Sequence, residues 1–154
     1  MGIEIERKFL VASDAWRAQA ERATRFSQGY LSRDPARTVR VRIAGEQAFL
    51  TIKGATHGAT RAEFEYAVPV ADAVALLAMC DGPVVEKVRH LCPCDDLTWE
   101  LDEFLGANAG LVLAEIELEH EGQPFTRPGW LGEEVTGEAR YVNANLAVNP
   151  FTRW

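Results

Sequence analysis

The sequence predicts a mainly β protein of the α+β class, in which eight antiparallel strands close into a barrel and a few helices lie outside it. Three observations predict this fold. Apolar and polar residues alternate with a period of two along most of the chain, which is typical of strands with two different faces. Short turns separate consecutive segments, so neighbouring strands are expected to run antiparallel. Closure into a barrel removes the exposed edges of such a sheet.

The clearest strand begins near the N-terminus. Within residues 3–11, Glu4, Glu6 and Lys8 lie on one face, and apolar side chains dominate the other face. Gly45-Glu46 predicts a tight hairpin turn further along the chain. Cys92-Pro93-Cys94, followed by two aspartates, predicts a second hairpin turn. The predicted strands are residues 3–11, 24–32, 39–44, 48–53, 61–68, 84–91, 97–104 and 111–119.

Helices are expected only between or after these strands. Ser13 predicts the N-cap of a first short helix. An Ala- and Leu-rich stretch predicts a second helix, which Asp81-Gly82-Pro83 ends. The predicted helices are residues 14–21, 72–79, 131–135 and 141–147.

Length and composition limit the classes of function. A chain of 154 residues is most simply one domain, residues 1–154, with a core of its own. A net charge of −7 argues against a nucleic-acid partner, because phosphate-backbone binding normally requires a basic domain. No apolar run of roughly 18 residues predicts a membrane span, and the N-terminus lacks the pattern of a signal peptide. We therefore expect a cytoplasmic protein without a membrane partner.

The charged strand faces are unusual because their signs are segregated. A solvated sheet surface is the ordinary explanation for such faces, but like charges on neighbouring positions repel, so a solvated face gains from mixing signs. One set of strand positions is acidic: Glu4, Glu6, Glu63, Glu65, Glu100, Asp102, Glu115, Glu117 and Glu119. The other set is basic: Lys8, Arg40, Arg42, Lys53, Arg61, Lys87 and Arg89.

Segregated charges predict a barrel with a charged interior and an apolar outer face, covered in part by helices or a second subunit. Cations would satisfy the acids, and a polyanion would satisfy the bases. Arginine binds phosphate oxygens through two parallel hydrogen bonds, and lysine acts as a point charge. Carboxylates without histidine or cysteine partners favour Mg²⁺ or Mn²⁺ over zinc. Residue chemistry alone thus points to a metal and phosphate site.

The sequence also resembles a known family. Glu4-Ile5-Glu6-Arg7-Lys8 is similar to the ExExK signature of the CYTH domain, or triphosphate tunnel metalloenzymes. The resemblance extends over essentially the whole chain. It includes the segments 28–31, 40–42, 51–53, 63–65, 86–89, 99–102 and 114–117, and the tail positions 134–136, 140–141 and 143.

The resemblance implies an eight-stranded tunnel that binds a triphosphate and a divalent metal, in a protein that forms a homodimer. The implied metal ligands, or their close supports, are Glu4, Glu6, Asp102, Glu115 and Glu117. The implied triphosphate-binding residues are Lys8, Arg40, Arg42, Lys53, Lys87 and Arg89. Glu63, Glu65, Glu100 and Glu119 are implied as ligands of a second metal or as partners of the bases, and Tyr30 as a residue that touches substrate or is simply buried.

The predicted activity is hydrolysis of a triphosphate, most simply inorganic tripolyphosphate, to pyrophosphate and phosphate. The catalytic residues are expected to be Lys87, Arg40 and Arg42. A metal-activated water is the favoured nucleophile, and Lys87 is an alternative general base if nearby cations lower its pKa. Family members also include adenylate cyclase, thiamine triphosphatase and RNA triphosphatase, so the substrates of these enzymes stay open as alternatives. A non-catalytic polyphosphate-binding module is a further alternative.

Overall fold

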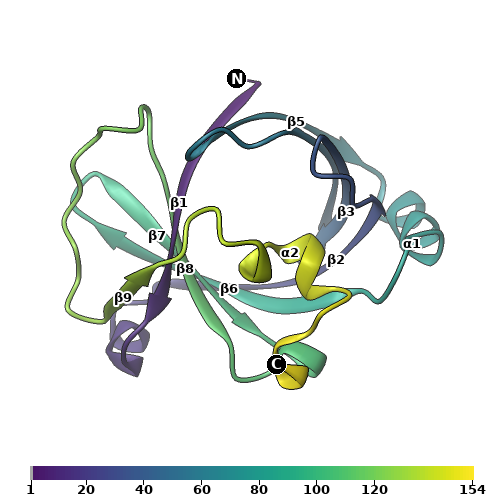
Figure 1. The fold of residues 1–154 in the computed structure, drawn as a ribbon. Helices are drawn as coiled ribbons and strands as arrows, with labels where there is room; N and C mark the ends of the chain where they lie inside the picture. Colours follow the sequence, from purple (N-terminus) through teal and green to yellow (C-terminus); the bar gives the residue numbers. More distant parts are fainter. Residues whose placement is uncertain (1) are drawn as a thin grey trace.

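A computed structural model describes residues 2–154, so the first residue of the predicted 1–154 domain lies outside the described residues. The sheet order is β5-β4-β3-β2-β6-β7-β8-β1-β9, and β1 also pairs with β5. Eight antiparallel strands therefore close into a barrel, viewed along its opening in Figure 1, and β9 is added beside β1. The predicted closed barrel is confirmed.

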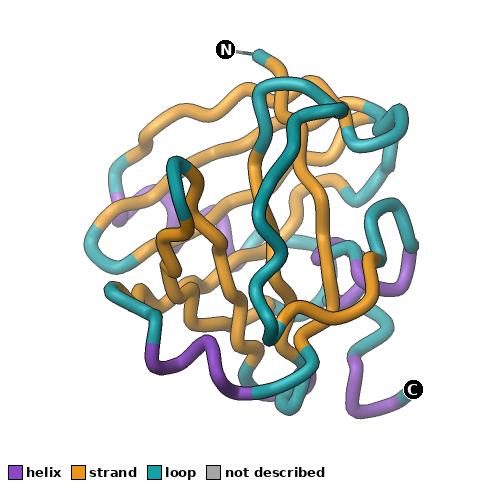
Figure 2. Tube along the Cα trace, turned by 90° about the vertical axis from the view of Figure 1, so that its left-hand side faces the viewer, coloured by secondary structure: helices purple, strands orange, loops and turns teal. Residues whose placement is uncertain are grey.

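The strands account for nearly half of the chain, and Figure 2 shows them winding around the barrel. Their bounds are β1 Ile3–Val11, β2 Arg22–Ser32, β3 Arg37–Ala44, β4 Gln47–Gly54, β5 Thr60–Val68, β6 Val85–Cys94, β7 Leu97–Phe104, β8 Val112–Glu117 and β9 Leu131–Glu134. The α-helices are α1 Val70–Ala78 and α2 Asn143–Leu146. Four 3₁₀ segments are η1 Asp14–Ala18, η2 Gly106–Asn108, η3 Ala139–Tyr141 and η4 Phe151–Arg153.

The core lies on the outer side of the barrel wall. Trp99 packs edge-on against Phe9 and Trp130, with ring centroids 5.6 and 5.7 Å apart. On another side, Ala73 of α1 packs against Val41 of β3 and other apolar residues of the wall. The outer face is thus apolar and partly covered, as predicted. Among the described residues, no helix has the length and apolar character needed to cross a membrane.

The predicted hairpins formed, one of them at a shifted position. Gly45 has a φ of 60° in the two-residue loop between Ala44 and Gln47, as its sequence predicts. The second turn is Asp95-Asp96 rather than Cys-Pro-Cys, because Asp95 adopts a φ of 55° that aspartate tolerates. Pro93 continues β6 opposite β7, beyond the last residue of β6 that pairs with β2, where its missing N–H breaks no bond to β2.

The helix predicted over residues 131–135 is wrong, because this segment is strand β9. Arg7 of β1 holds Glu134 through two hydrogen bonds, of 2.8 and 2.6 Å. Gly132 lies so close to the backbone of β1 that an added Cβ would be 2.9 Å from the Leu10 oxygen. The free outer edge of β1 therefore captures a segment that its sequence alone does not mark as a strand.

Several other boundaries differ from the predictions. The helix predicted over residues 141–147 is the shorter α2, and β6 continues to Cys94, beyond its predicted end at residue 91. The first helix is the 3₁₀ segment η1, which ends at Ala18, although Ser13 does cap it by accepting from the Ala15 amide. The second helix, α1, begins two residues before the predicted start and ends at Ala78. Strand β8 ends at Glu117 instead of the predicted residue 119.

Candidate active site

The barrel encloses a cavity of about 350 Å³ whose wall is formed by charged side chains. All of the predicted site residues line it except Asp102 and Glu119. The predicted residues that line the cavity are Glu4, Glu6, Lys8, Tyr30, Arg40, Arg42, Lys53, Glu63, Glu65, Lys87, Arg89, Glu100, Glu115 and Glu117. Period-two alternation thus places nearly all the selected charges inside the barrel.

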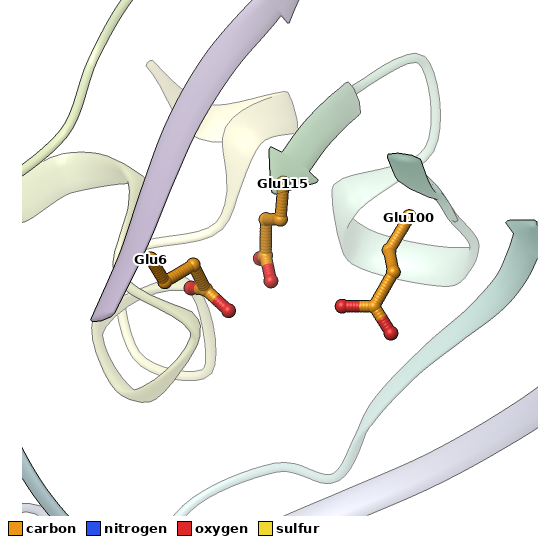
Figure 3. A group of neighbouring side chains, drawn as sticks. All are labelled: Glu6, Glu100 and Glu115. Carbon is orange, nitrogen blue, oxygen red and sulfur yellow. The ribbon is translucent and has the colours of Figure 1, made fainter. Parts of the chain in front are cut away.

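Three carboxylates form an acid cluster, defined as Glu6, Glu100 and Glu115, with one oxygen of each lying within 4.8 Å of the others. Figure 3 shows them converging from three different strands. Glu100 of β7 lies directly opposite Glu115 of β8, a pairing that is destabilising unless something neutralises it. Three closely spaced carboxylate oxygens are a donor set that suits a hard divalent cation.

The pKa values in the acid cluster reflect burial and the repulsion between its carboxylates. Burial, followed by the charges of Glu115 and Glu4, raises the pKa of Glu6 well above its ordinary value. Burial also raises the pKa of Glu100, against the lowering effect of Arg89. Burial would raise the pKa of Glu115 too, but Lys8 and other nearby cations outweigh it and lower the pKa to about 2. A cation at this cluster would favour the charged form of all three.

Glu4 lies outside this cluster and is held by a base. The Lys53 Nζ donates to both Glu4 oxygens, at 3.0 and 3.2 Å, and lies 3.3 Å from Glu63. Burial raises the pKa of Glu63, and its hydrogen bond with Glu4 raises it further. Despite burial, Lys53 and Glu63 together lower the pKa of Glu4. Glu4 and Glu63 therefore share Lys53, and a metal bound by Glu4 has to compete with this lysine.

A neighbouring part of the wall is a basic group, defined as Lys87, Arg89 and the Asp102 between them. Arg89 also lies 3.1 Å from Glu100 and 3.5 Å from Glu115 of the acid cluster. The fully buried Asp102 carboxylate accepts from the Lys87 Nζ at 2.7 Å and from two Arg89 nitrogens at 2.8 and 2.9 Å. These cations overcome burial and hold the pKa of Asp102 far below its ordinary value. Both Asp102 oxygens are thus occupied by bases, and the residue lies behind the cavity wall.

Lys87 itself is almost fully buried, with 1% of its surface exposed. Burial is the main cause that lowers its pKa, to about 7, and Arg89 and Arg42 act in the same direction against Asp102. Burial, more than the nearby cations, thus makes the neutral form of Lys87 accessible near neutral pH, which the general-base alternative would require.

Arg40 and Arg42 lie side by side on β3, with their guanidinium groups at the cavity. The Arg42 Nε donates to Gln28 at 2.9 Å, and the guanidinium lies 4.6 Å from the centre of the Phe26 ring. Burial, with Arg40 and Arg89, lowers the pKa of Arg42 to about 9. Arg40 donates to Thr51 at 3.1 Å and lies 3.5 Å from Glu65. Concentrated, poorly compensated positive charge of this kind attracts a polyanion.

The remaining predicted residues have different surroundings. Tyr30 is buried, lines the cavity and accepts a hydrogen bond from Gln28 at 3.2 Å. Glu65 accepts from Thr51 at 2.9 Å. Glu117 lines the cavity at the exposed end of β8, whereas Glu119 lies beyond this strand, exposed and away from the cavity. The predicted strand position of Glu119 was wrong because the chain leaves the barrel after Glu117.

The C-terminal part of the chain contributes to the wall, as its resemblance to the tail of short family members implies. The segment between β9 and α2 crosses the barrel opening in Figure 1. This segment contacts Lys8 of β1, whose Nζ donates a hydrogen bond of 3.1 Å to the Tyr141 carbonyl oxygen. This segment has no alternating pattern, and only the resemblance of the tail to short family members marked it. The C-terminal residues that line the cavity are Thr136, Gly137 and Val142 of this segment, and Asn143 and Ala144 of α2.

Comparisons with known proteins show the family and its named relatives. The CYTH domain model matches residues 2–147. The chain is 47% identical to the inorganic triphosphatase of Acetivibrio thermocellus, over 98% of this chain and 97% of the relative. It is 37% identical to the inorganic triphosphatase of Nitrosomonas europaea, over 95% and 97% of the two chains.

Solved structures show the same fold. The crystal structure of the inorganic triphosphatase NE1496 is similar with a TM-score of 0.67 and 37% identity, covering 94% of each chain. The PH1012 protein from Pyrococcus horikoshii OT3 has a TM-score of 0.60 at 20% identity, with 77% and 79% of the two chains covered. At that identity the second likeness supports the fold alone.

Proposed function

The chain belongs to the CYTH domain family, and we propose that it is a metal-dependent inorganic triphosphatase. The observation that carries the proposal is the placement of the acid cluster and the basic group in one enclosed cavity. The acid cluster suits a divalent cation, and the basic group suits a chain of phosphates. The two relatives named inorganic triphosphatase support tripolyphosphate as the substrate.

The acid cluster is the proposed site of the metal, with Mg²⁺ or Mn²⁺ as the ion. Glu6, Glu100 and Glu115 supply oxygen donors without nitrogen or sulfur, which fits these hard ions. When bound, the ion supplies charge neutralisation at phosphate oxygens and a lowered pKa for water. We assign Asp102 to holding Lys87 and Arg89 rather than to the metal, because both of its oxygens already accept hydrogen bonds from these bases.

The bases bind and orient the triphosphate. Arg40 and Arg42 line the cavity from β3. Lys87 and Arg89 line it from β6, so two strands supply positive charge to the cavity. These groups stabilise the charge that develops on the phosphate oxygens when the terminal P–O–P bond breaks. Water supplies the new oxygen, and pyrophosphate leaves as phosphate forms. In its charged form Lys87 donates to Asp102 and keeps an N–H group for a phosphate oxygen, so we assign it to this contact rather than to accepting the proton of the attacking water.

The test is a comparison of substrates. Purified protein is assayed for phosphate release from tripolyphosphate, ATP and thiamine triphosphate, with Mg²⁺ and then with Mn²⁺. We expect kcat/KM for tripolyphosphate to exceed that for ATP by at least about tenfold, because hydrolysis of tripolyphosphate needs no grip on a nucleoside. Cyclic AMP as the main product from ATP would support the adenylate cyclase alternative instead. Tight binding without turnover would support a non-catalytic polyphosphate-binding module.

A homodimer and a cytoplasmic location stay predictions. Ile3, Phe64 and Tyr66 are exposed apolar side chains on β1 and β5 that would suit a subunit contact. Sedimentation of the purified protein, compared with a variant in which Phe64 and Tyr66 are replaced by serine, tests the dimer.

A further inference from the structure

Asn143 is the first residue of α2, and its side chain reaches into the barrel wall. Its Oδ1 accepts a hydrogen bond from the Lys87 Nζ at 2.9 Å and another from the Gln28 Nε2 at 3.2 Å. Neither contact belongs to a strand pairing. The C-terminal segment therefore contacts the most deeply buried base of the cavity directly.

The contact fixes the direction of the Lys87 ammonium group. An ammonium has three N–H donors. One donates to Asp102 at 2.7 Å and one to Asn143 at 2.9 Å, so two of the three directions are occupied by acceptors of the protein. Since Lys87 lines the cavity, the remaining donor is the one available to a substrate oxygen or a water. Loss of one fixed acceptor would allow the ammonium to rotate and shift.

Gln28 links the same contact to Arg42. The Gln28 side chain is fully buried, and its Oε1 accepts from the Arg42 Nε at 2.9 Å. Its Nε2 is the group that donates to Asn143. Asn143 therefore joins two bases that belong to different strands, Lys87 on β6 and Arg42 on β3.

The position of Asn143 is set by packing outside the cavity rather than by Lys87. Leu146, on the same short helix, is fully buried in a cluster with Val85 and Phe104. The Leu146 carbonyl oxygen accepts from Asn108 at 3.3 Å. A rigidly packed anchor three residues away holds Asn143 where it contacts the ammonium.

We propose that Asn143 is a positioning residue, whose side-chain oxygen holds the Lys87 ammonium in the direction needed for phosphoryl transfer. The inference rests on the proposed triphosphatase function. It assigns a catalytic consequence to a segment outside the strands of the barrel.

The experiment compares two changes at Asn143 that differ in the acceptor they leave. Asn143→Ala removes the oxygen, and we expect kcat for tripolyphosphate to fall about tenfold or more while KM changes by less than about threefold. Asn143→Asp keeps an oxygen in the same place but adds negative charge. We expect its kcat to stay within about threefold of wild type while KM rises, because the charge repels the polyanion.

Asn145→Ala is the matched control. Asn145 lies on the same helix, and its amide donates to the Ala139 carbonyl oxygen at 2.7 Å, away from the cavity. This change weakens the C-terminal segment without removing a Lys87 contact. We expect a lower Tm and an unchanged kcat.

The outcomes separate this inference from the proposed function. Wild-type kcat in Asn143→Ala, or an equal loss of kcat in Asn143→Asp, would overturn the positioning role while the triphosphatase assignment stands. An equal loss of kcat in Asn145→Ala would do the same, because it would trace the effect to the segment's stability. A wild-type protein without triphosphatase activity would overturn the proposed function and this inference with it.

Discussion

The acid cluster and the basic group lie in the same barrel but are stabilised in opposite ways. In the basic group, Lys87 and Arg89 share the Asp102 carboxylate, and every oxygen of that carboxylate accepts a hydrogen bond. In the acid cluster, Glu6 has carboxylates as its nearest charged neighbours, and its pKa is raised. The basic group is neutralised by the protein itself. In the acid cluster, Arg89 contacts Glu100 and Glu115, and Lys8 contacts Glu115, so the protein neutralises this cluster only in part.

This difference indicates what each region contributes to binding. A buried ion pair that already has its hydrogen bonds keeps its geometry without a ligand. A cluster of like charges destabilises the empty protein, and a cation that binds only the folded state recovers that free energy. The barrel therefore holds its basic group ready for phosphate, while the acid cluster provides the driving force for metal binding. Four predictions test this contrast.

The largest effect is expected when the basic group loses its central carboxylate. Asp102→Ala leaves the buried Lys87 without its carboxylate and leaves Arg89 only its contacts with Glu100 and Glu115, so the free energy of unfolding should fall by about 3–5 kcal/mol. Urea denaturation monitored by circular dichroism measures it. Glu103→Ala is the control on the same strand, since Glu103 pairs at the surface with Arg17 at 2.7 Å, and about 1 kcal/mol or less is expected. Equal losses in the two variants would show that the buried Asp102 ion pairs contribute no more stability than the surface pair of Glu103.

The second effect concerns catalysis and the acid cluster. Glu6→Gln removes a charged oxygen donor, so kcat/KM with Mg²⁺ should fall by about a hundredfold, or roughly 2.7 kcal/mol. The same change relieves repulsion, so the metal-free protein should melt at a higher temperature than wild type. This expected gain in stability is opposite to the loss of stability expected for Asp102→Ala. Glu119→Gln, outside the cavity, is the control and should keep wild-type activity. Full activity of Glu6→Gln would remove the metal-ligand assignment.

The third effect separates cavity bases from surface bases. Arg42→Ala removes a guanidinium at the cavity and should lower kcat/KM for tripolyphosphate by about tenfold, or roughly 1.4 kcal/mol, and Arg40→Ala should act similarly. Arg25→Ala is the control, because Arg25 is exposed and pairs with Glu86 outside the barrel at 3.1 Å. A steady-state assay measures all three. Comparable losses in Arg25→Ala would indicate a general effect of protein charge.

The strand faces could be predicted from the sequence because their information is local. Glu4, Glu6 and Lys8 share a face by alternation alone, and that face became the cavity. The grouping within the cavity could not be predicted in this way. Glu100 joins Glu115 through the register of β7 and β8, and Asp102 lies between Lys87 and Arg89 through the register of β6 and β7. Register depends on how neighbouring strands pair across the sheet, and the residue pattern of a single strand does not specify that pairing.

The C-terminal part of the chain shows a second limit. Residues 131–135 were predicted as helix, yet the free edge of β1 and the Arg7–Glu134 ion pair make them strand β9. Asn143 belongs to no alternating pattern and was marked only by the resemblance of the tail, because its contact with Lys87 depends on where Leu146 anchors α2. Segments whose structure is set by tertiary contacts rather than by propensity are those that the sequence predicts least well.

The smallest effect is a dependence of stability on pH in the metal-free protein. The pKa values of Glu6 and Glu100 are raised in the folded state above the ordinary value of 4.5. Groups of this kind contribute stability that is fully present below the unfolded value and is lost as pH rises through the folded value. Asp102 and Glu115 have lowered pKa values and act in the opposite direction, but they lose stability only as pH falls from about 4 toward 2. Lys87 changes stability mainly above pH 7, since its pKa is lowered to about 7.

Between about pH 5 and pH 7 the acid cluster is therefore expected to dominate. The metal-free protein should melt a few degrees higher at about pH 5 than at about pH 7, which corresponds to about 1 kcal/mol for a chain of this size. Saturating Mg²⁺ should raise the Tm at the higher pH and reduce the difference, because a bound cation neutralises the charged carboxylates. Glu6→Gln should reduce the difference without metal. Scanning calorimetry at both pH values, with EDTA and then with Mg²⁺, makes the comparison. A metal-free protein that melts lower at pH 5 than at pH 7 would mean that repulsion in the acid cluster does not govern its stability.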